Sequence, residues 1–85
     1  MNENKVLIKV IVPELDNSYD VFVPINRKIG NIIELLNKSI SDMNGDCFEI
    51  NNKRCLYNRY TGTRYNFNNI LYETDIRNDS VLVLI

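Results

Sequence analysis

The chain closes with the stretch Ser80-Val81-Leu82-Val83-Leu84-Ile85. Five of these six residues are aliphatic and three are β-branched, a composition typical of a buried strand. We therefore expect a last strand over residues 81–85. The order of the earlier segments, which follows below, predicts that this strand lies in the centre of a sheet and completes it.

Two segments near the N-terminus predict the strands that begin this sheet. Residues 5–12 read Lys-Val-Leu-Ile-Lys-Val-Ile-Val and stop at Pro13, and residues 19–23 alternate before Pro24. Because only a short polar turn separates them, an antiparallel hairpin is the simplest pairing of the two.

A change of period after this hairpin predicts a helix over residues 28–43. Its apolar residues recur with the spacing of a helix that has one face for the core, at positions Ile29, Ile32, Ile33, Leu36, Ile40 and Met43. Asn44-Gly45 follows and supplies a left-handed stop.

The segment between the helix and the last strand predicts only short elements. We expect a brief extended piece over residues 47–50, a strand over residues 54–58 and a short strand at residues 64–65. A single helical turn over residues 68–71 and a tight turn over residues 75–79 then lead into the last strand.

These elements predict one α+β domain over residues 1–85, in which a mixed sheet of four or five strands packs on one main helix. Residues 5–12 and 80–85 are expected to pair in parallel at its centre, since the helix supplies the crossover that parallel strands require. Ile32, Leu36, Leu71 and Leu82 are expected to be nearly fully buried.

The composition of the chain argues against some classes of function, those that depend on nucleic acid or on a membrane. The 85 residues are 45% hydrophobic and carry a net charge of -1, which gives no global attraction to nucleic acid or to an anionic membrane. No stretch approaches the ~20 apolar residues that span a bilayer. The start of the chain lacks the pattern of a signal peptide, so we expect a cytoplasmic protein without membrane insertion.

Residue types that carry catalysis are scarce. The chain has no histidine, which removes the usual general base for a serine or cysteine nucleophile. Two cysteines, Cys47 and Cys55, are too few for a metal site, and we interpret both as small buried hydrophobes. We expect no enzyme activity, metal or cofactor.

Two segments carry a resemblance to a known family. Val23-Pro24, followed by Lys28-Ile29-Gly30-Asn31-Ile32 and Leu36, has the spacing with which ubiquitin-like domains enter their helix. The segment from Leu71 to Leu82 resembles their closing segment, in which a leucine, an isoleucine and a leucine fill the core around a polar turn. The resemblance covers residues 5–85 and implies the β-grasp roll of ubiquitin.

The turn before the last strand is most similar to that of the YukD/EsaB family, small bacterial ubiquitin-like proteins encoded with type VII secretion systems. Family members commonly have glycine where this chain has Asp79, which predicts a strained turn. This resemblance implies an accessory or regulatory protein of the secretion machine that is neither conjugated nor catalytic.

Some ubiquitin-like proteins are carriers or are conjugated to other proteins, and such a function remains an alternative for this chain. Ubiquitin and the sulfur carriers react through a flexible tail that ends in Gly-Gly, whereas Gly30, Gly45 and Gly62 all lie far from the last residue here. We expect the carrier or conjugated-modifier function only if the C-terminus of the chain is processed or truncated.

Alternation along the strands predicts an apolar outer face. If Val6, Ile8 and Val10 face the helix together with Cys55 and Tyr57, the opposite face is mostly aliphatic, although it should be polar in a two-layer domain. An exposed patch of this kind typically marks an interaction site. We predict a protein-binding surface formed by Leu7, Ile11, Leu56, Val83 and Ile85.

We expect charged residues at the edge of this surface. Residues 53–65 hold four cations and no acid among three tyrosines, and we assign Arg54, Arg59 and Arg64 to a polar rim. The alternative to this rim is a solvated strand and loop whose tyrosines anchor the loop to the core, and nucleic-acid binding through residues 53–65 is less favoured than either. Glu14, Asp16 and Asp20 form an acidic turn that, with the basic stretch, could orient a partner.

The expected partner is a protein. A component of a type VII secretion system, such as its membrane ATPase, is the first candidate, and a second copy of this chain, which would make a homodimer, is the other.

Overall fold

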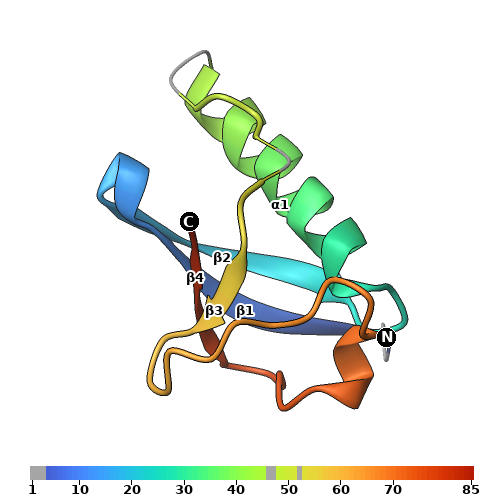
Figure 1. Cartoon of the computed structure of the whole chain (residues 1–85). Coiled ribbons are helices and arrows are strands. Elements are labelled where there is room, and N and C mark those ends of the chain that lie inside the picture. The colour runs from blue at the N-terminus through green and yellow to red at the C-terminus, as the bar shows by residue number, and fades with distance from the viewer. Residues whose placement is uncertain (1–3, 46–47, 52) are drawn as a thin grey trace.

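The computed structural model describes residues 4–45, 48–51 and 53–85, and it has the predicted α+β architecture. Four strands form one mixed sheet in the order β2-β1-β4-β3, and the α-helix α1 lies across one face of it (Figure 1). The strands are β1 (Lys5–Val12), β2 (Asn17–Pro24), β3 (Leu56–Asn58) and β4 (Val81–Leu84).

The β1–β2 hairpin is longer than the sequence predicts. All eight residues of β1 pair with β2 in antiparallel register, from Lys5 opposite Pro24 to Val12 opposite Asn17. A short 3-10 turn, η1 (Pro13–Leu15), joins the strands and is closed by Asp16 with a left-handed φ of 50°. The turn is therefore compact, and β2 begins two residues earlier than expected.

Parallel pairing of β4 with β1 confirms the predicted centre of the sheet. Lys9, Val10 and Ile11 lie opposite Val81, Leu82 and Val83, and β3 flanks β4 on its other side in antiparallel register. Beyond β4, the main chain of Ile85 exchanges two hydrogen bonds with Cys55, with N···O distances of 3.1 and 2.7 Å. The last residue is thus held in the sheet.

The helix α1 (Ile29–Asn44) confirms the predicted one-sided core helix. Its core-facing side chains interlock with the inner face of the sheet and are all buried: Ile29, Ile32, Ile33, Leu36 and Ile40. The expectation for Met43 is wrong, because this side chain in the last turn is exposed. Gly45 ends the helix with a positive φ of 61°, but its ψ of -128° differs from the left-handed helical conformation that the Asn-Gly pair predicts.

The core contains all four residues expected there. Ile32, Leu36, Leu71 and Leu82 are fully buried, and they belong to one continuous cluster with the inner residues of β1 and β4. Of the two cysteines, Cys55 is free and half-buried, and Cys47 lies outside the described residues. The interpretation of Cys55 as a buried core residue is wrong.

The connection between α1 and β4 differs from the expected short elements. β3 covers only residues 56–58, and Arg64 forms an isolated bridge with Tyr57 in place of a strand. The helical turn is η3 (Leu71–Glu73), later than the predicted 68–71. Its start is fixed by the segment before α1, because the amides of Leu71 and Tyr72 donate to the carbonyls of Arg27 and Ile25 at 2.9 and 3.0 Å.

The turn before β4 has the strained backbone that a non-glycine residue at position 79 predicts. Asp79 has a φ of 70°, a left-handed conformation that costs a non-glycine residue free energy. Hydrogen bonds to β1 hold it there: the Leu7 amide donates to Asn78 Oδ1 and the Asp79 amide donates to the Leu7 carbonyl, both at 2.8 Å.

The two leucines at the middle of α1 offer a matched test of this packing. Leu36 is fully buried and Leu35 is 44% exposed. Leu36→Ala is expected to lower the free energy of unfolding by ~2–5 kcal/mol, because it leaves a cavity in the core. Leu35→Ala should cost less than about 1 kcal/mol. Equal shifts of the urea midpoint for the two variants would contradict this placement.

Candidate protein-interaction surface

The outer face of the sheet gathers side chains from all four strands. Alternation places Leu7, Lys9 and Ile11 of β1 on this face, with Val83 of β4 beside Ile11. The antiparallel register of β3 then sets Tyr57 against Val83. Three apolar side chains from three neighbouring strands therefore lie side by side on the face that α1 does not cover.

The prediction that Leu56 lies on this face is wrong. Leu56 is fully buried and pairs with Leu84, which is also fully buried, so both point toward α1. Tyr57 occupies the outer position in its place and is half-buried. A strand of three residues is too short for alternation to fix its phase, and only the register with β4 decides it.

The prediction that Arg54 belongs to an exposed rim is also wrong. Arg54 is buried, and its guanidinium donates to both carboxylate oxygens of Glu14, at 3.1 and 3.3 Å, and to the Glu49 carbonyl at 2.7 Å. The same group lies 4.1 Å from the centroid of the Phe48 ring. Arg54 therefore ties the turn η1 to the segment after α1.

This ion pair changes the interpretation of the acidic turn. Glu14 compensates a buried cation and leaves only Asp16 and Asp20 of the three acids as solvated charges of the hairpin. The acidic turn and the basic stretch of residues 53–65 are thus joined where Glu14 contacts Arg54.

Arg59 and Arg64 are exposed, as predicted, and neither forms an ion pair within the described part of the chain. The loop that carries them is anchored at its base, where the Tyr65 hydroxyl donates to Asp75 at 2.6 Å and accepts from the Asn58 amide at 3.2 Å. Burial, and then the hydrogen bond to Asp75, raise the pKa of Tyr65 to about 12. This phenol therefore keeps its proton, and its hydrogen bond to Asp75, even near pH ~10, where an unperturbed tyrosine titrates.

Asn58 also fixes the tip of this loop. Its Oδ1 accepts hydrogen bonds from the amides of Tyr60 and Thr61, at 2.8 and 3.1 Å. Gly62 turns the chain with a φ of 74°. The loop is therefore a defined border beside the apolar side chains.

A shallow depression of about 560 Å³ forms where these features meet. Its wall is mostly apolar, and Arg59 and Gly62 lie at its border. The residues that line it are Ile11, Pro13, Tyr57, Asn58, Arg59, Gly62, Val83 and Ile85. We call it the outer-face depression. Ile85 at its rim is 59% exposed.

The structure therefore brings together only part of the predicted site. Ile11, Val83, Ile85 and Arg59 meet at the outer-face depression. Leu7 lies at the other half of the face, opposite Phe22, which is 65% exposed. Tyr57 and Pro13 were missed by the sequence analysis.

The described residues show neither a cluster of metal ligands nor a helix suited to a membrane. Residues 4–45, 48–51 and 53–85 contain no group of three cysteine, aspartate or glutamate side chains placed to hold a metal ion. Within the same residues, α1 is too short and too polar to cross a membrane.

Comparisons by sequence match no family model and no curated protein. Many solved structures match by shape. A structure described as molecular mimicry of SUMO that promotes DNA repair aligns with a TM-score of 0.78 and 7% identity, over 100% of this chain and 95% of that chain. A solution structure of an N-terminal ubiquitin-like domain aligns with a TM-score of 0.68 and 16% identity, over 99% and 76%.

A third similar structure belongs to a larger assembly. A chain of the ESX-5 inner membrane complex aligns with a TM-score of 0.70 and 15% identity, over 96% of this chain but only 21% of that one. Identities this low establish the fold alone. The fold of this chain is the ubiquitin-like β-grasp fold.

The contact between Arg54 and Glu14 can be tested by removing the acid. Glu14→Ala leaves the buried guanidinium without its charge partner and should lower the free energy of unfolding by about 1–2 kcal/mol, since Glu14 itself is half exposed. Asp42→Ala is the control, because Asp42 is exposed and forms no ion pair within the described residues. Denaturation midpoints that fall equally in the two variants would show that the pair contributes nothing.

Proposed function

We propose that this ubiquitin-like chain is a non-enzymatic protein-interaction module that acts in the cytoplasm as an accessory or regulatory component of a bacterial type VII secretion system. The observation that supports the interaction role is the outer-face depression, an apolar hollow on the sheet face opposite the helix.

An apolar hollow at this position is unusual for a two-layer domain. The outer face of such a sheet is ordinarily solvated and polar. Here Ile11, Val83 and Tyr57 pack side by side, and Ile85 extends the apolar area outward. A partner that covers these side chains would remove exposed apolar surface from water, which is the main gain in most protein associations.

The border of the depression favours a partner with acidic residues. Arg59 lines the depression. Arg64 lies next to it, because its main chain forms an isolated β-bridge with Tyr57, which also lines the depression. Neither arginine is neutralised by an ion pair within the described residues. Two such cations at the edge of an apolar patch would steer an acidic partner and fix its orientation.

The secretion role has separate support. The turn before β4 is similar to that of the YukD/EsaB family, and Asp79 adopts the left-handed conformation that this turn needs. The same fold occurs in a chain of the ESX-5 inner membrane complex. We propose a component of the secretion machine, such as its membrane ATPase, as the partner, with self-association as the alternative.

The other functions weighed above have less support. Nucleic-acid binding through residues 53–65 would depend on four cations, but one of them, Arg54, is buried against Glu14 and cannot contact phosphates. Tyr65 is buried as well, so the loop offers mainly Tyr60 for stacking. Nothing in the described residues favours sulfur transfer or conjugation.

Substitution at the depression tests the proposal. Ile85→Asp and Tyr57→Asp place a charge where a partner would exclude water, and each should weaken binding by about tenfold or more. The measurement is titration of the purified cytoplasmic part of the type VII ATPase from the source organism, with sedimentation to detect self-association.

Tyr72→Asp is the matched control, since Tyr72 is 53% exposed and lies in η3, outside the depression. Thermal unfolding should show that all three variants remain folded. If the folded Ile85→Asp and Tyr57→Asp proteins bind and self-associate like the parent chain, the depression is not the interface.

A further inference from the structure

The helix α1 ends in a pair of residues that is chemically reactive. Asn44-Gly45 is the only asparagine–glycine pair in the sequence. An asparagine side chain can react with the main-chain nitrogen of the residue that follows it, and glycine leaves that nitrogen open because it has no side chain. Neither residue lines the outer-face depression, so this chemistry goes beyond the proposed function.

The reaction needs only water as a second reactant. The Gly45 nitrogen attacks Cγ of Asn44, and the new N–Cγ bond closes a succinimide ring. The Cγ–Nδ2 bond breaks, and Nδ2 leaves as ammonia with the proton of the Gly45 amide. Water then opens the ring. Opening at the side-chain carbonyl gives aspartate, and opening at the main-chain carbonyl gives isoaspartate, in which the chain runs through Cγ.

The folded chain holds the Asn44 side chain away from this nitrogen. Asn44 is the last residue of α1, and its Nδ2 donates to the Ile40 carbonyl at 2.7 Å. Because Ile40 lies one turn earlier, the bond directs Cγ toward the preceding turn, whereas the Gly45 nitrogen lies toward the end of the helix. Ring closure therefore requires this bond to break and the last turn to open.

A second contact to Asn44 comes from the sheet. The hydroxyl of Tyr19, on β2, lies 3.0 Å from Nδ2 and 3.2 Å from Oδ1 of Asn44. Tyr19 is half-buried and packs against the core, so its hydroxyl is held in place. The Asn44 amide thus joins the end of α1 to the start of β2, and both elements fix its position.

Gly45 has no comparable protection. It is exposed to water, and a Cβ placed on it would meet none of the described atoms within 4 Å. Once the Asn44 side chain is free, nothing among these atoms hinders the approach of the Gly45 nitrogen or the attack of water on the ring. The contacts of Asn44 with Tyr19 and Ile40 are therefore what limits the reaction.

We infer that Asn44 is a self-modification site, at which the chain exchanges the side-chain amide for a carboxylate, and that the Tyr19 hydroxyl controls the rate. The carboxylate cannot donate to the Ile40 carbonyl. It also places a negative charge at the C-terminal end of α1, where the helix dipole is already negative and the last turn has no basic residue. The modification therefore releases the last turn of α1 from β2.

The first arm of the test measures the rate. The purified chain is incubated in neutral buffer, and mass spectrometry of the intact protein and its peptides follows the replacement of NH2 by OH at residue 44. Tyr19→Phe removes only the hydroxyl and should speed the reaction about fivefold, the factor that corresponds to one net hydrogen bond. In urea, where both contacts are lost, the parent chain should react faster still.

Tyr65→Phe is the matched control for the rate. It also removes a hydrogen-bonded hydroxyl, but one that contacts Asp75 and Asn58 and not Asn44. Its rate should equal that of the parent chain. Equal rates for the parent and Tyr19→Phe would contradict the inference. Equal acceleration in Tyr19→Phe and Tyr65→Phe would contradict it as well, since the reaction would then follow unfolding of the whole chain.

The second arm examines the product. Ion exchange separates the aged parent chain into unmodified and modified forms, because the modified form carries an additional negative charge. In the modified form, and in Asn44→Asp, the amides of residues 41–44 should exchange hydrogen about tenfold faster than in the parent. The NMR signals of Ile11, Tyr57 and Val83, in the outer-face depression, should not change.

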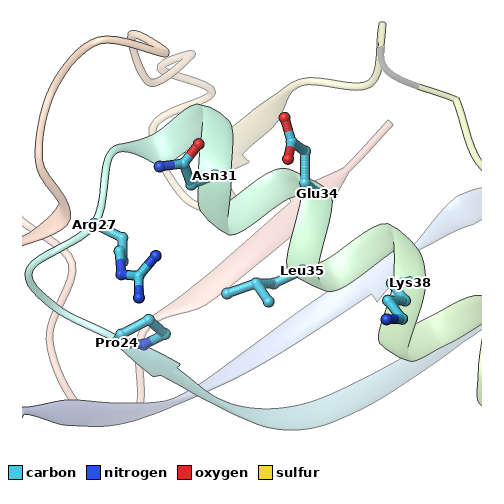
Figure 2. Close-up of a pocket in the computed structure, with 6 residues that line it drawn as sticks. All are labelled: Pro24, Arg27, Asn31, Glu34, Leu35 and Lys38. Atoms are coloured by element: carbon cyan, nitrogen blue, oxygen red, sulfur yellow. The ribbon is translucent and has the colours of Figure 1, made fainter.

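Asn31→Asp makes the same chemical change at the opposite end of the helix. Figure 2 shows Asn31 where α1 begins, and this residue is exposed. A negative charge is favourable near the start of a helix, so residues 41–44 should keep the exchange rates of the parent. If the modified chain and Asn44→Asp also exchange like the parent, the Asn44 amide does not hold the helix end, and the inference is wrong.

Discussion

The parallel pairing of β4 with β1 is the constraint on which the rest of the structure depends. It joins the two ends of the chain through only three residue pairs, Lys9 with Val81, Val10 with Leu82 and Ile11 with Val83. Parallel neighbours cannot be joined by a tight turn, so the chain must cross over the sheet, and α1 makes that crossing. The loop-closure entropy of this long connection is offset by the core that it closes.

One register thereby fixes both faces of the sheet. On the inner face it places Leu82 and Leu84 in the cluster under α1, where both are fully buried. On the outer face it sets Val83 between Ile11 and Tyr57 and so builds the floor of the outer-face depression. The residues that close the core and those that form the candidate surface alternate along the same four-residue strand, which couples stability to the proposed function.

The sequence predicted the long elements because their patterns are long. The eight strand residues before Pro13 and the four turns of helically spaced apolar residues are each compatible with only one type of secondary structure. Asp79, which stands where members of the YukD/EsaB family commonly have glycine, indicated the turn before β4. Leu56 was placed on the wrong face because β3 has only three residues, and its phase depends on pairing with Leu84. Arg54 was taken for a surface charge because its partners, Glu14 and Phe48, are distant in sequence or lie in a segment without periodicity.

The most direct test of this account is the stability of chains shortened at the closing strand, measured by urea denaturation. A chain that ends at Val83 loses the fully buried Leu84 and the two main-chain hydrogen bonds of Ile85. Its free energy of unfolding should fall by at least about 3 kcal/mol. A chain that ends at Leu84 should show a smaller loss. If all three proteins unfold at the same urea concentration, the closing strand does not hold the fold, and the account of both faces built on it is wrong.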